Sequence, residues 1–331
     1  MSSKGFRLLR HLLLLPLLLI SVCFEESCGD SNTNLRPIIG ILSQEPPEDL
    51  LELLPDKNYT SFIDACYVKF VESAGARVVP IFINQNNSYY ENIASSVNGI
   101  LFPGGDVSMT NSSGYGAAGQ KLYELAVKAY DEGIHLPVWG TCLGQEMILY
   151  LAGNQTDWMT SCLAENKADS LTLQPDHEHS RIFREMPERI KYFLEFQNTT
   201  VNFHEHCSTP ENFTASGLIG DFRMLATSFD YFDLEYVAVV EHREMPIFAS
   251  QFHPEMTPFQ WPADGHHNNI PHSSEAVQVS HFFANFFVSQ ARFNDQHFLT
   301  PEEEEEALIY NYQSTFTGYE GMIYTEVYLF R

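Results

Sequence analysis

The chain has 331 residues, of which 18 are Lys or Arg and 43 are Asp or Glu, so its formal net charge at pH 7 is −25. A balance this acidic excludes a protein that holds nucleic acid or anionic lipid by charge attraction, and we expect neither as a partner. The length is sufficient for one large domain or two small ones.

The first residues have the pattern of a targeting segment. Three basic residues precede a leucine-rich block over residues 12–22, and acidic sequence begins at Glu25. This is the layout of a secretory signal peptide, and the block is shorter than the ~20 apolar residues that a membrane helix needs. We predict a signal peptide over residues 1–24 and a single domain over residues 25–331, with no membrane attachment after cleavage.

Six N-x-S/T sequons follow, beginning at Asn58, Asn86, Asn111, Asn154, Asn198 and Asn212. Such triplets arise by chance, but six of them behind a signal peptide indicate a glycosylated, exported chain. We therefore expect the secretory pathway, with a lysosomal or extracellular endpoint.

The six cysteines form no metal motif. Cys23 and Cys28 lie at the leader and just after it, and the other four are scattered without a C-x-x-C pair: Cys66, Cys142, Cys162 and Cys207. This spacing argues against a zinc site. If Cys142 is reactive, Cys23 is removed with the leader and Cys28 is kept, four cysteines remain. They allow three disulfide pairings, which the sequence does not rank.

Strand and helix patterns alternate through the first half of the chain. The patterns predict strands at 36–42, 76–84, 99–105 and 136–140, and helices at 61–75, 89–97 and 119–133 and directly after Cys142. Such alternation predicts a parallel sheet covered by helices on both faces, with functional sites at the carboxyl ends of its strands.

The second half has a different pattern. EYVAVVEH (235–242) and PIFASQF (246–252) predict an antiparallel hairpin, residues 274–292 a long helix with an aromatic face, and EEEEEAL (302–308) a solvated helix start. The predicted fold is therefore α/β: a three-layer sandwich with a mostly parallel central sheet, helices on both faces and an added antiparallel hairpin.

The stretch VWGTCLGQE places Cys142 between a strand and a helix, with Gly140 and Gly144 on either side. This is the pattern of the G-x-S-x-G nucleophile elbow, with sulfur in place of the hydroxyl. The N-terminus of the helix would lower the pKa of the thiol and offer the backbone N–H of Leu143 to an oxyanion. A buried structural cysteine is the alternative, and this stretch alone does not decide between them.

A nucleophilic cysteine needs a base, and the base needs a group that orients it. FASQFHPEM places His253 and Glu255 two residues apart at the end of a predicted strand, where they would share one face. LFPGGDV ends another strand with Gly104 and Gly105, whose N–H groups would complete an oxyanion hole. Taken alone, HPE is typical of a surface turn and Gly-Gly of an ordinary loop.

These motifs occur in an order that resembles a known family. GTCLG followed by Glu146, then Q-x-HPE downstream of FPGG, is similar to the class I glutamine amidotransferase superfamily. Longer stretches resemble the gamma-glutamyl hydrolases, or folate conjugases, within it: PIIGIL, LFPGGDV, WGTCLGQE, VNFHEH, SQFHPEMTPFQW, FFVSQAR and EEEEEALIYNY. The resemblance runs from Pro37 to the end of the chain.

The resemblance implies hydrolysis of the γ-glutamyl peptide bonds of folylpoly-γ-glutamates and antifolate polyglutamates. The products would be glutamate or poly-γ-glutamate, no metal or cofactor would be needed, and the usual state would be a homodimer. It makes Cys142 the nucleophile, His253 its proton-transfer partner and Glu255 the supporting acid. His204, in VNFH, occupies the position of the family's second histidine, which we interpret as a substrate-binding or electrostatic group, with an ordinary core or surface histidine as the alternative.

Further expectations concern the surroundings of these residues. The N–H groups of Leu143 and Gly105 would hold the oxyanion. Gln145 and Phe252 depart from the residues frequent in the family, and we expect them to affect specificity more than chemistry. The groups that could bind the substrate's carboxylates are His204, His206, Arg223, Arg243, His266, His267 and His272.

Other functions stay open from the sequence. The same nucleophile would serve a glutaminase subunit that delivers ammonia to a synthase, but the leader and the sequons argue against a cytosolic partner enzyme. A catalytically inactive secreted module that binds folate or a protein is the alternative from another class, and a cysteine peptidase that cleaves α-bonds is a further one.

Overall fold

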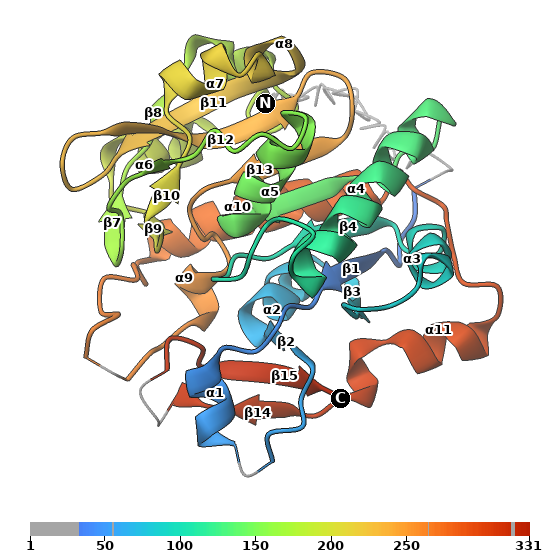
Figure 1. Ribbon diagram of the computed structural model, residues 1–331. Helices are drawn as coiled ribbons and strands as arrows, with labels where there is room; N and C mark the ends of the chain where they lie inside the picture. Colours follow the sequence, from blue (N-terminus) through green and yellow to red (C-terminus); the bar gives the residue numbers. More distant parts are fainter. Residues whose placement is uncertain (1–32, 55, 264, 319–321) are drawn as a thin grey trace, which may run out of the picture. The chain divides into compact units, whose positions relative to one another are not determined.

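The computed structural model describes residues 33–54, 56–263, 265–318 and 322–331 (Figure 1). The predicted signal peptide, Cys23 and Cys28 lie outside the described residues. Within them, no helix is both long enough and apolar enough to cross a membrane.

An eight-stranded mixed sheet forms the centre of the domain. In order across the sheet, its strands are β3 (Arg77–Ile81), β1 (Ile38–Leu42), β4 (Gly99–Phe102), β5 (Val138–Thr141), β13 (Ile247–Ser250), β12 (Glu235–His242), β11 (Phe222–Phe229) and β8 (Thr172–Leu173). The first five are parallel to one another, and the last three continue the sheet in antiparallel fashion. The predicted hairpin is β12 and β13, and β13 joins it to the parallel part through β5.

Helices cover both faces of this sheet (Figure 1). One apolar cluster contains side chains of α2 (Ala65–Ser73), α6 (Glu188–Phe196) and α10 (Ser274–Ala291). The other contains side chains of α3 (Asn87–Ala94), α4 (Gly114–Asp131), α5 (Leu143–Ala152), α7 (Pro210–Ala215) and α8 (Leu218–Asp221). In β5, Trp139 belongs to the first cluster and Val138 to the second, because neighbouring strand residues point to opposite faces. The predicted three-layer sandwich is confirmed.

The prediction of one helix over 61–75 is wrong in its first part. Ser61–Asp64 is strand β2, which pairs with β15 (Glu326–Phe330) in a small sheet completed by β14 (Ser314–Phe316). Helix α2 starts at Ala65, where the Asp64 side chain accepts a hydrogen bond from the Cys66 N–H. The strand partner lies at the far end of the chain, so the local pattern did not reveal it.

The remaining elements are short. The helices among them are α1 (Glu48–Leu53), α9 (Met256–Phe259), α11 (Pro301–Ala307) and two 3₁₀ turns, η1 (Pro175–His179) and η2 (Ile309–Asn311). Two strand pairs, β6 (Thr160–Ser161) with β10 (His206–Cys207) and β7 (Lys167–Asp169) with β9 (Thr200–Asn202), build an irregular region between α5 and α7. The glutamate run forms α11 as predicted, and its Glu304 pairs with Arg36 and Arg77.

Candidate active site

Cys142 lies at the sharp turn between β5 and α5, as predicted. Its backbone has φ 52° and ψ −111°, a conformation that residues other than glycine rarely adopt. The turn also brings two backbones close together: a Cβ on Gly144 would lie 2.1 Å from the Phe102 carbonyl oxygen. Only glycine fits at position 144, and the turn directs the Cys142 side chain to the carboxyl ends of the parallel strands.

His253 and Glu255 come together beside Cys142. The Glu255 carboxylate Oε1 lies 2.7 Å from Nδ1 of His253, and both side chains are buried. An Nδ1–H donated to the carboxylate leaves Nε2 without a proton, and this nitrogen is buried with no hydrogen-bond partner in the described residues. The Cys142 thiol interacts with the ring. The predicted contact is present, but the predicted geometry is wrong: β13 ends at Ser250, and Glu255 has helical backbone angles at the start of α9.

The thiol and the imidazole influence each other's protonation. Burial raises the pKa of the Cys142 thiol, and the nearby His253 and the N–H of Leu143 act in the opposite direction without cancelling it. The pKa lowering expected at the helix N-terminus is therefore not what the structure gives. Burial opposes the charge on His253, but the Glu255 carboxylate and the Cys142 sulfur together raise its pKa well above the ordinary value.

Gly104 packs into the middle of this group. A Cβ at position 104 would lie 2.7 Å from Cε1 of His253, 2.9 Å from the Tyr67 hydroxyl and 3.1 Å from Cβ of Cys142. Its own N–H donates to the Tyr67 hydroxyl at 2.7 Å, so it is already engaged. None of the hydrogen bonds found in the described residues engages the N–H of Gly105, so this donor stays available.

Tyr67 is a site residue that the sequence analysis missed. It belongs to the buried face of α2, and its hydroxyl lies 3.5 Å from Nδ1 of His253. In sequence it is one aromatic residue on the apolar face of an amphipathic helix, and nothing separates it there from a core residue. Its hydroxyl links the Gly104 backbone to the histidine.

These residues border a cleft of about 710 Å³. Carboxylic acids line much of it, namely Asp64, Asp106, Glu146, Asp157, Glu165 and Glu205. The other ionisable lining groups include four histidines, His204, His206, His253 and His267, and the described lining residues include no Lys or Arg. An anionic ligand would therefore meet imidazoles and backbone N–H groups rather than permanent cations.

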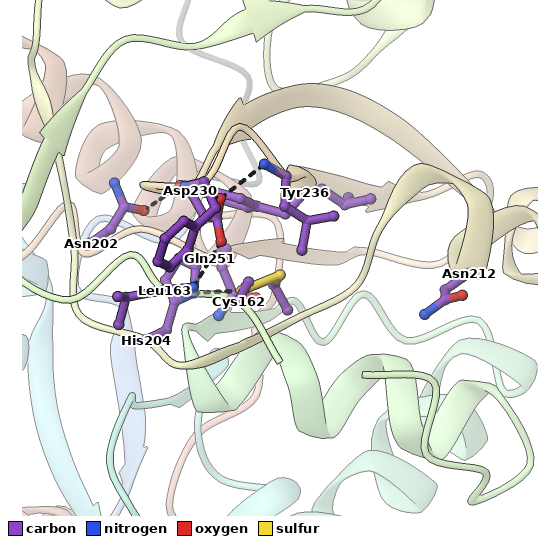
Figure 2. Close-up of a disulfide and its surroundings, with 12 residues drawn as sticks. Cys162, Leu163, Asn202, His204, Asn212, Asp230, Tyr236 and Gln251 are labelled. Atoms are coloured by element: carbon purple, nitrogen blue, oxygen red, sulfur yellow. Dashed lines mark hydrogen bonds between the residues drawn. A yellow bond between two sulfur atoms is a disulfide. The ribbon is translucent and has the colours of Figure 1, made fainter. Parts of the chain in front are cut away.

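His204 is buried in the wall of the cleft. Burial and the nearby His253 lower its pKa to about 3, so its ring is neutral at any physiological pH. The ring meets Tyr236 edge to face at 4.9 Å and lies with Nδ1 3.5 Å from Sγ of Cys162 (Figure 2). Of the two roles considered for it, the geometry favours a neutral hydrogen-bonding group over an electrostatic one.

Four of the proposed carboxylate-binding residues do not line the cleft. Arg223 contacts Glu241 at 3.1 Å and Arg243 contacts Asp176 at 3.6 Å, near the start of β11 and the end of β12. His266 is absent from the lining residues, and so is His272, which stacks on Trp261. His204, His206 and His267 are the members of that set at the cleft.

Gln145 and Phe252 are core residues rather than cleft residues. The Gln145 amide donates to the Val237 carbonyl at 3.0 Å and to Oε1 of Gln251 at 3.1 Å. Gln251 in turn donates to Oε1 of Glu146 at 2.9 Å, and burial raises the pKa of that carboxyl to about 7. Gln251 also lies 3.9 Å from Sγ of Cys142, so Gln145 reaches the cleft through Gln251, which contacts both Glu146 and Cys142.

Comparison with known proteins identifies the relatives of this chain. The model of the family described as peptidase C26 matches residues 37–255. The chain is 38% identical to the gamma-glutamyl hydrolase of Rattus norvegicus over 283 residues, which cover 86% of each chain. It is 36% identical to that of Homo sapiens over 297 residues, covering 89% of this chain and 90% of the other.

Among solved structures, a putative GMP synthase protein from Thermoplasma acidophilum matches 82% of this chain and 98% of its own. The sequence identity is 16% and the TM-score is 0.41, a likeness too distant to inform function.

Proposed function

The chain belongs to the peptidase C26 family and to the gamma-glutamyl hydrolases, and on this premise we propose that it cleaves the γ-glutamyl bonds of folylpoly-γ-glutamates. The observation that carries the proposal is that Cys142 and His253 interact and line one cleft, while the buried Glu255 contacts His253. Antifolate polyglutamates carry the same bond and are expected substrates, with glutamate or poly-γ-glutamate as the product.

The first step is attack by sulfur. The Cys142 thiol first passes its proton to Nε2 of His253, and Sγ then forms a bond to the γ-carbonyl carbon. Because burial raises the pKa of the thiol, an isolated thiolate is not the resting form, and the reactive species is the thiolate–imidazolium pair. Glu255 stabilises that imidazolium through Nδ1–H.

The negative charge that develops on the carbonyl oxygen needs donors. The N–H groups of Leu143 and Gly105 are the two proposed, and each donor of this type contributes about 3 to 4 kcal/mol to the transition state in comparable sites. Tyr67 holds Gly104, the residue before Gly105, in place by accepting a hydrogen bond from its N–H. The hole is thus built from one helix start and one strand-end loop.

The second half of the reaction returns the enzyme to its starting state. The imidazolium of His253 donates its proton to the departing α-nitrogen as the C–N bond breaks, which leaves a thioester on Cys142. The same imidazole then takes a proton from water, whose oxygen bonds to the thioester carbon. The C–S bond breaks, the shortened acid leaves, and the proton returns from His253 to Sγ of Cys142. No group beyond the chain's own residues is required.

Substrate recognition in this acidic cleft is proposed to depend on neutral and weakly basic groups. His206 and His267 present imidazoles to the cleft, while His204 offers a neutral ring. We propose His204 as a contact to the substrate. Burial raises the pKa of Glu146 to about 7, so an acidic compartment removes a negative charge from the cleft and suits it better than a neutral one.

Processing and assembly of the chain are also proposed. We propose that residues 1–24 are removed as a signal peptide, that residues 25–331 act as a single domain, and that the product is lysosomal or extracellular and homodimeric. Export is supported by the exposure of five of the sequon asparagines, which are Asn58, Asn86, Asn111, Asn154 and Asn198. Asn212 is only partly exposed, and its amide donates to the Trp158 carbonyl.

The proposal is tested with the purified secreted chain on folate pentaglutamate and on glutamine, at pH ~5 and ~7, with the product lengths resolved. We expect γ-glutamyl cleavage and faster turnover at the lower pH. Ammonia release from glutamine without cleavage of the pentaglutamate would instead assign the chain to glutaminase chemistry. Binding of the pentaglutamate without turnover would assign it to an inactive binding module.

A further inference from the structure

One wall of the cleft is a short, irregular stretch of chain. Phe203, His204, Glu205 and His206 all line the cleft, between β9 and the end of β10. The ends of this stretch are fixed by the main sheet region: Val201 accepts a hydrogen bond from the His253 N–H, and Ser208 accepts one from Val237. Between these two points the stretch leaves the sheet and bends into the cleft.

The middle of the wall is held by residues 160–164. The Cys162 N–H donates to the Glu205 carbonyl at 2.9 Å, and the Ala164 N–H donates to the His204 carbonyl at 3.0 Å. Two-residue strands such as β6 and β10 are too short to be stable by themselves. A disulfide between Cys162 and Cys207 joins the two segments covalently, and both cysteines are buried.

The disulfide also touches a proposed substrate contact. Sγ of Cys162 lies 3.5 Å from Nδ1 of His204, beside Tyr236 (Figure 2). The other ring nitrogen, Nε2, is buried and has no hydrogen-bond partner in the described part of the chain. In the same wall, the Phe203 carbonyl accepts the Cys142 thiol at 3.8 Å. The disulfide therefore contacts His204 directly. Phe203, which contacts Cys142, is the residue that precedes His204 in the chain.

We infer that the Cys162–Cys207 disulfide is a positioning element of the cleft, which fixes the ring of His204 for substrate binding. This inference rests on the proposed function. The reacting groups Cys142, His253 and Glu255 lie at the end of β5, after β13 and at the start of α9. Their hydrogen bonds to the wall are to Val201 and Phe203, which precede Cys207 in the chain and are not joined by the disulfide. Its removal is therefore expected to raise KM more than it lowers kcat.

The test compares the wild-type chain with the double variant Cys162→Ala, Cys207→Ala, both secreted and purified intact, on folate pentaglutamate. We expect kcat/KM to fall about 10- to 100-fold, because a displacement of about 1 Å in a positioning group can cost about 100-fold. The alkylation rate of Cys142 with iodoacetamide should stay within about threefold, since the nucleophile and its base are unchanged. Val288→Ala, a core change in α10 away from the cleft, controls for loss of stability.

A double-mutant cycle separates positioning from general damage. If the disulfide acts through His204, its removal should cost almost nothing further in a His204→Asn background. If the losses from removing the disulfide and from His204→Asn multiply, the inference is overturned. It is also overturned if kcat/KM of the double cysteine variant stays within threefold of wild type, or if Val288→Ala loses as much activity as that variant. Should the alanine pair fail to fold, Cys162→Val with Cys207→Val keeps more of the buried volume and is tested in the same way.

The two proposals fail differently in these assays. A wild-type chain that does not cleave the pentaglutamate overturns the proposed function and this inference with it. An active wild-type chain whose double variant is equally active overturns the inference alone. Mass spectrometry of a non-reduced digest gives the remaining check, because absence of a peptide linking Cys162 to Cys207 would also overturn it.

Discussion

The two ends of the central sheet carry opposite arrangements of charge. At the carboxyl ends of β4, β5 and β13, the cleft is lined by carboxylic acids and histidines, and its described lining includes no Lys or Arg. At the other end, Arg181 and Arg223 contact the buried Glu241. Arg243 shares Asp176 with Arg223 there. The strong cations of this region are thus already paired, away from the reacting groups.

This difference shows how a chain of net charge −25 can act on an anionic substrate. A permanent cation in the cleft would hold the product carboxylate as firmly as that of the substrate. A carboxyl group can donate a hydrogen bond to an anion only while it is protonated, and burial raises the pKa of Glu146 to about 7, so the affinity of the cleft follows the pH of its compartment. The guanidinium groups instead stabilise the antiparallel edge of the sheet. The comparison predicts large effects of substitution at one end and small effects at the other.

The largest effect is expected at the nucleophile. Cys142→Ala should lower kcat/KM by at least about 10⁴-fold, because no other group in the cleft can form the thioester. Steady-state assay on folate pentaglutamate measures this, with circular dichroism to show that the fold is kept. Full activity in this variant would show that the bond is not cleaved at Cys142, and the comparison of the two ends of the sheet would then say nothing about catalysis.

His253→Ala should follow, with a loss of at least about 10²-fold as general acid and base are removed together. The loss should appear in kcat, since the ring moves protons during the reaction. A change below threefold would mean that another group transfers the proton.

Glu255→Ala should be milder, at about 10-fold, because it removes the orientation of the imidazole and the stabilisation of its charge but leaves the ring in place. Kinetics on the same substrate measure it beside His253→Ala. Equal losses in the two variants would show that the carboxylate does more than orient the ring.

Glu146→Gln should change the pH dependence. In the wild type, burial raises the pKa of Glu146 to about 7, beside Asp157, His206 and His253. The neutral form therefore persists up to about pH 7, and ionisation above it adds a negative charge to the cleft. KM should rise through pH 7 in the wild type and stay flat in the glutamine variant, which keeps the size of the side chain and its acceptor for Gln251.

The same pKa has a consequence for stability. Because the folded pKa of Glu146 is higher than the unfolded value, the folded state loses stability as the pH rises from about 4.5 to about 7, by up to about 3 kcal/mol. Glu146→Gln should therefore raise Tm at pH 8 but not at pH 4. If the pH profiles of Tm and of KM have the same shape in the wild type and in Glu146→Gln, the assignment of this pKa to Glu146 is refuted.

The smallest effect is expected at the opposite end of the sheet. Arg243→Ala should leave KM within about twofold and the free energy of unfolding within about 1 kcal/mol, because its partners are a partly exposed carboxylate and the Ile219 carbonyl, both away from the cleft. A tenfold rise in KM would place a substrate carboxylate at this end and break the comparison.

The sequence predicted the parts of the site that local patterns encode. The glycines beside Cys142, the strand before it and the helix after it are adjacent in the chain, so the elbow could be found there. His253 and Glu255 were paired correctly for the wrong reason, since the chain turns before them instead of continuing as a strand.

Other parts depend on contacts between distant segments. Strand β2 exists because β15 pairs with it from the end of the chain. Tyr67 reaches Gly104 and His253 only once α2 packs on the sheet. The partner of Cys162 follows from the pairing of β6 with β10, each of two residues. The charge of Arg223 could be counted in the sequence, but its position in the fold could not be predicted from it.

The backbone at Cys142 has a consequence for how such an enzyme can evolve. A non-glycine residue held at φ 52° costs on the order of 1 to 3 kcal/mol, a sizeable share of the roughly 5 to 15 kcal/mol that stabilises a folded domain. Glycine would relieve that cost and remove the sulfur. Selection for heat resistance alone would thus drive position 142 toward glycine, and only selection for turnover keeps a cysteine there.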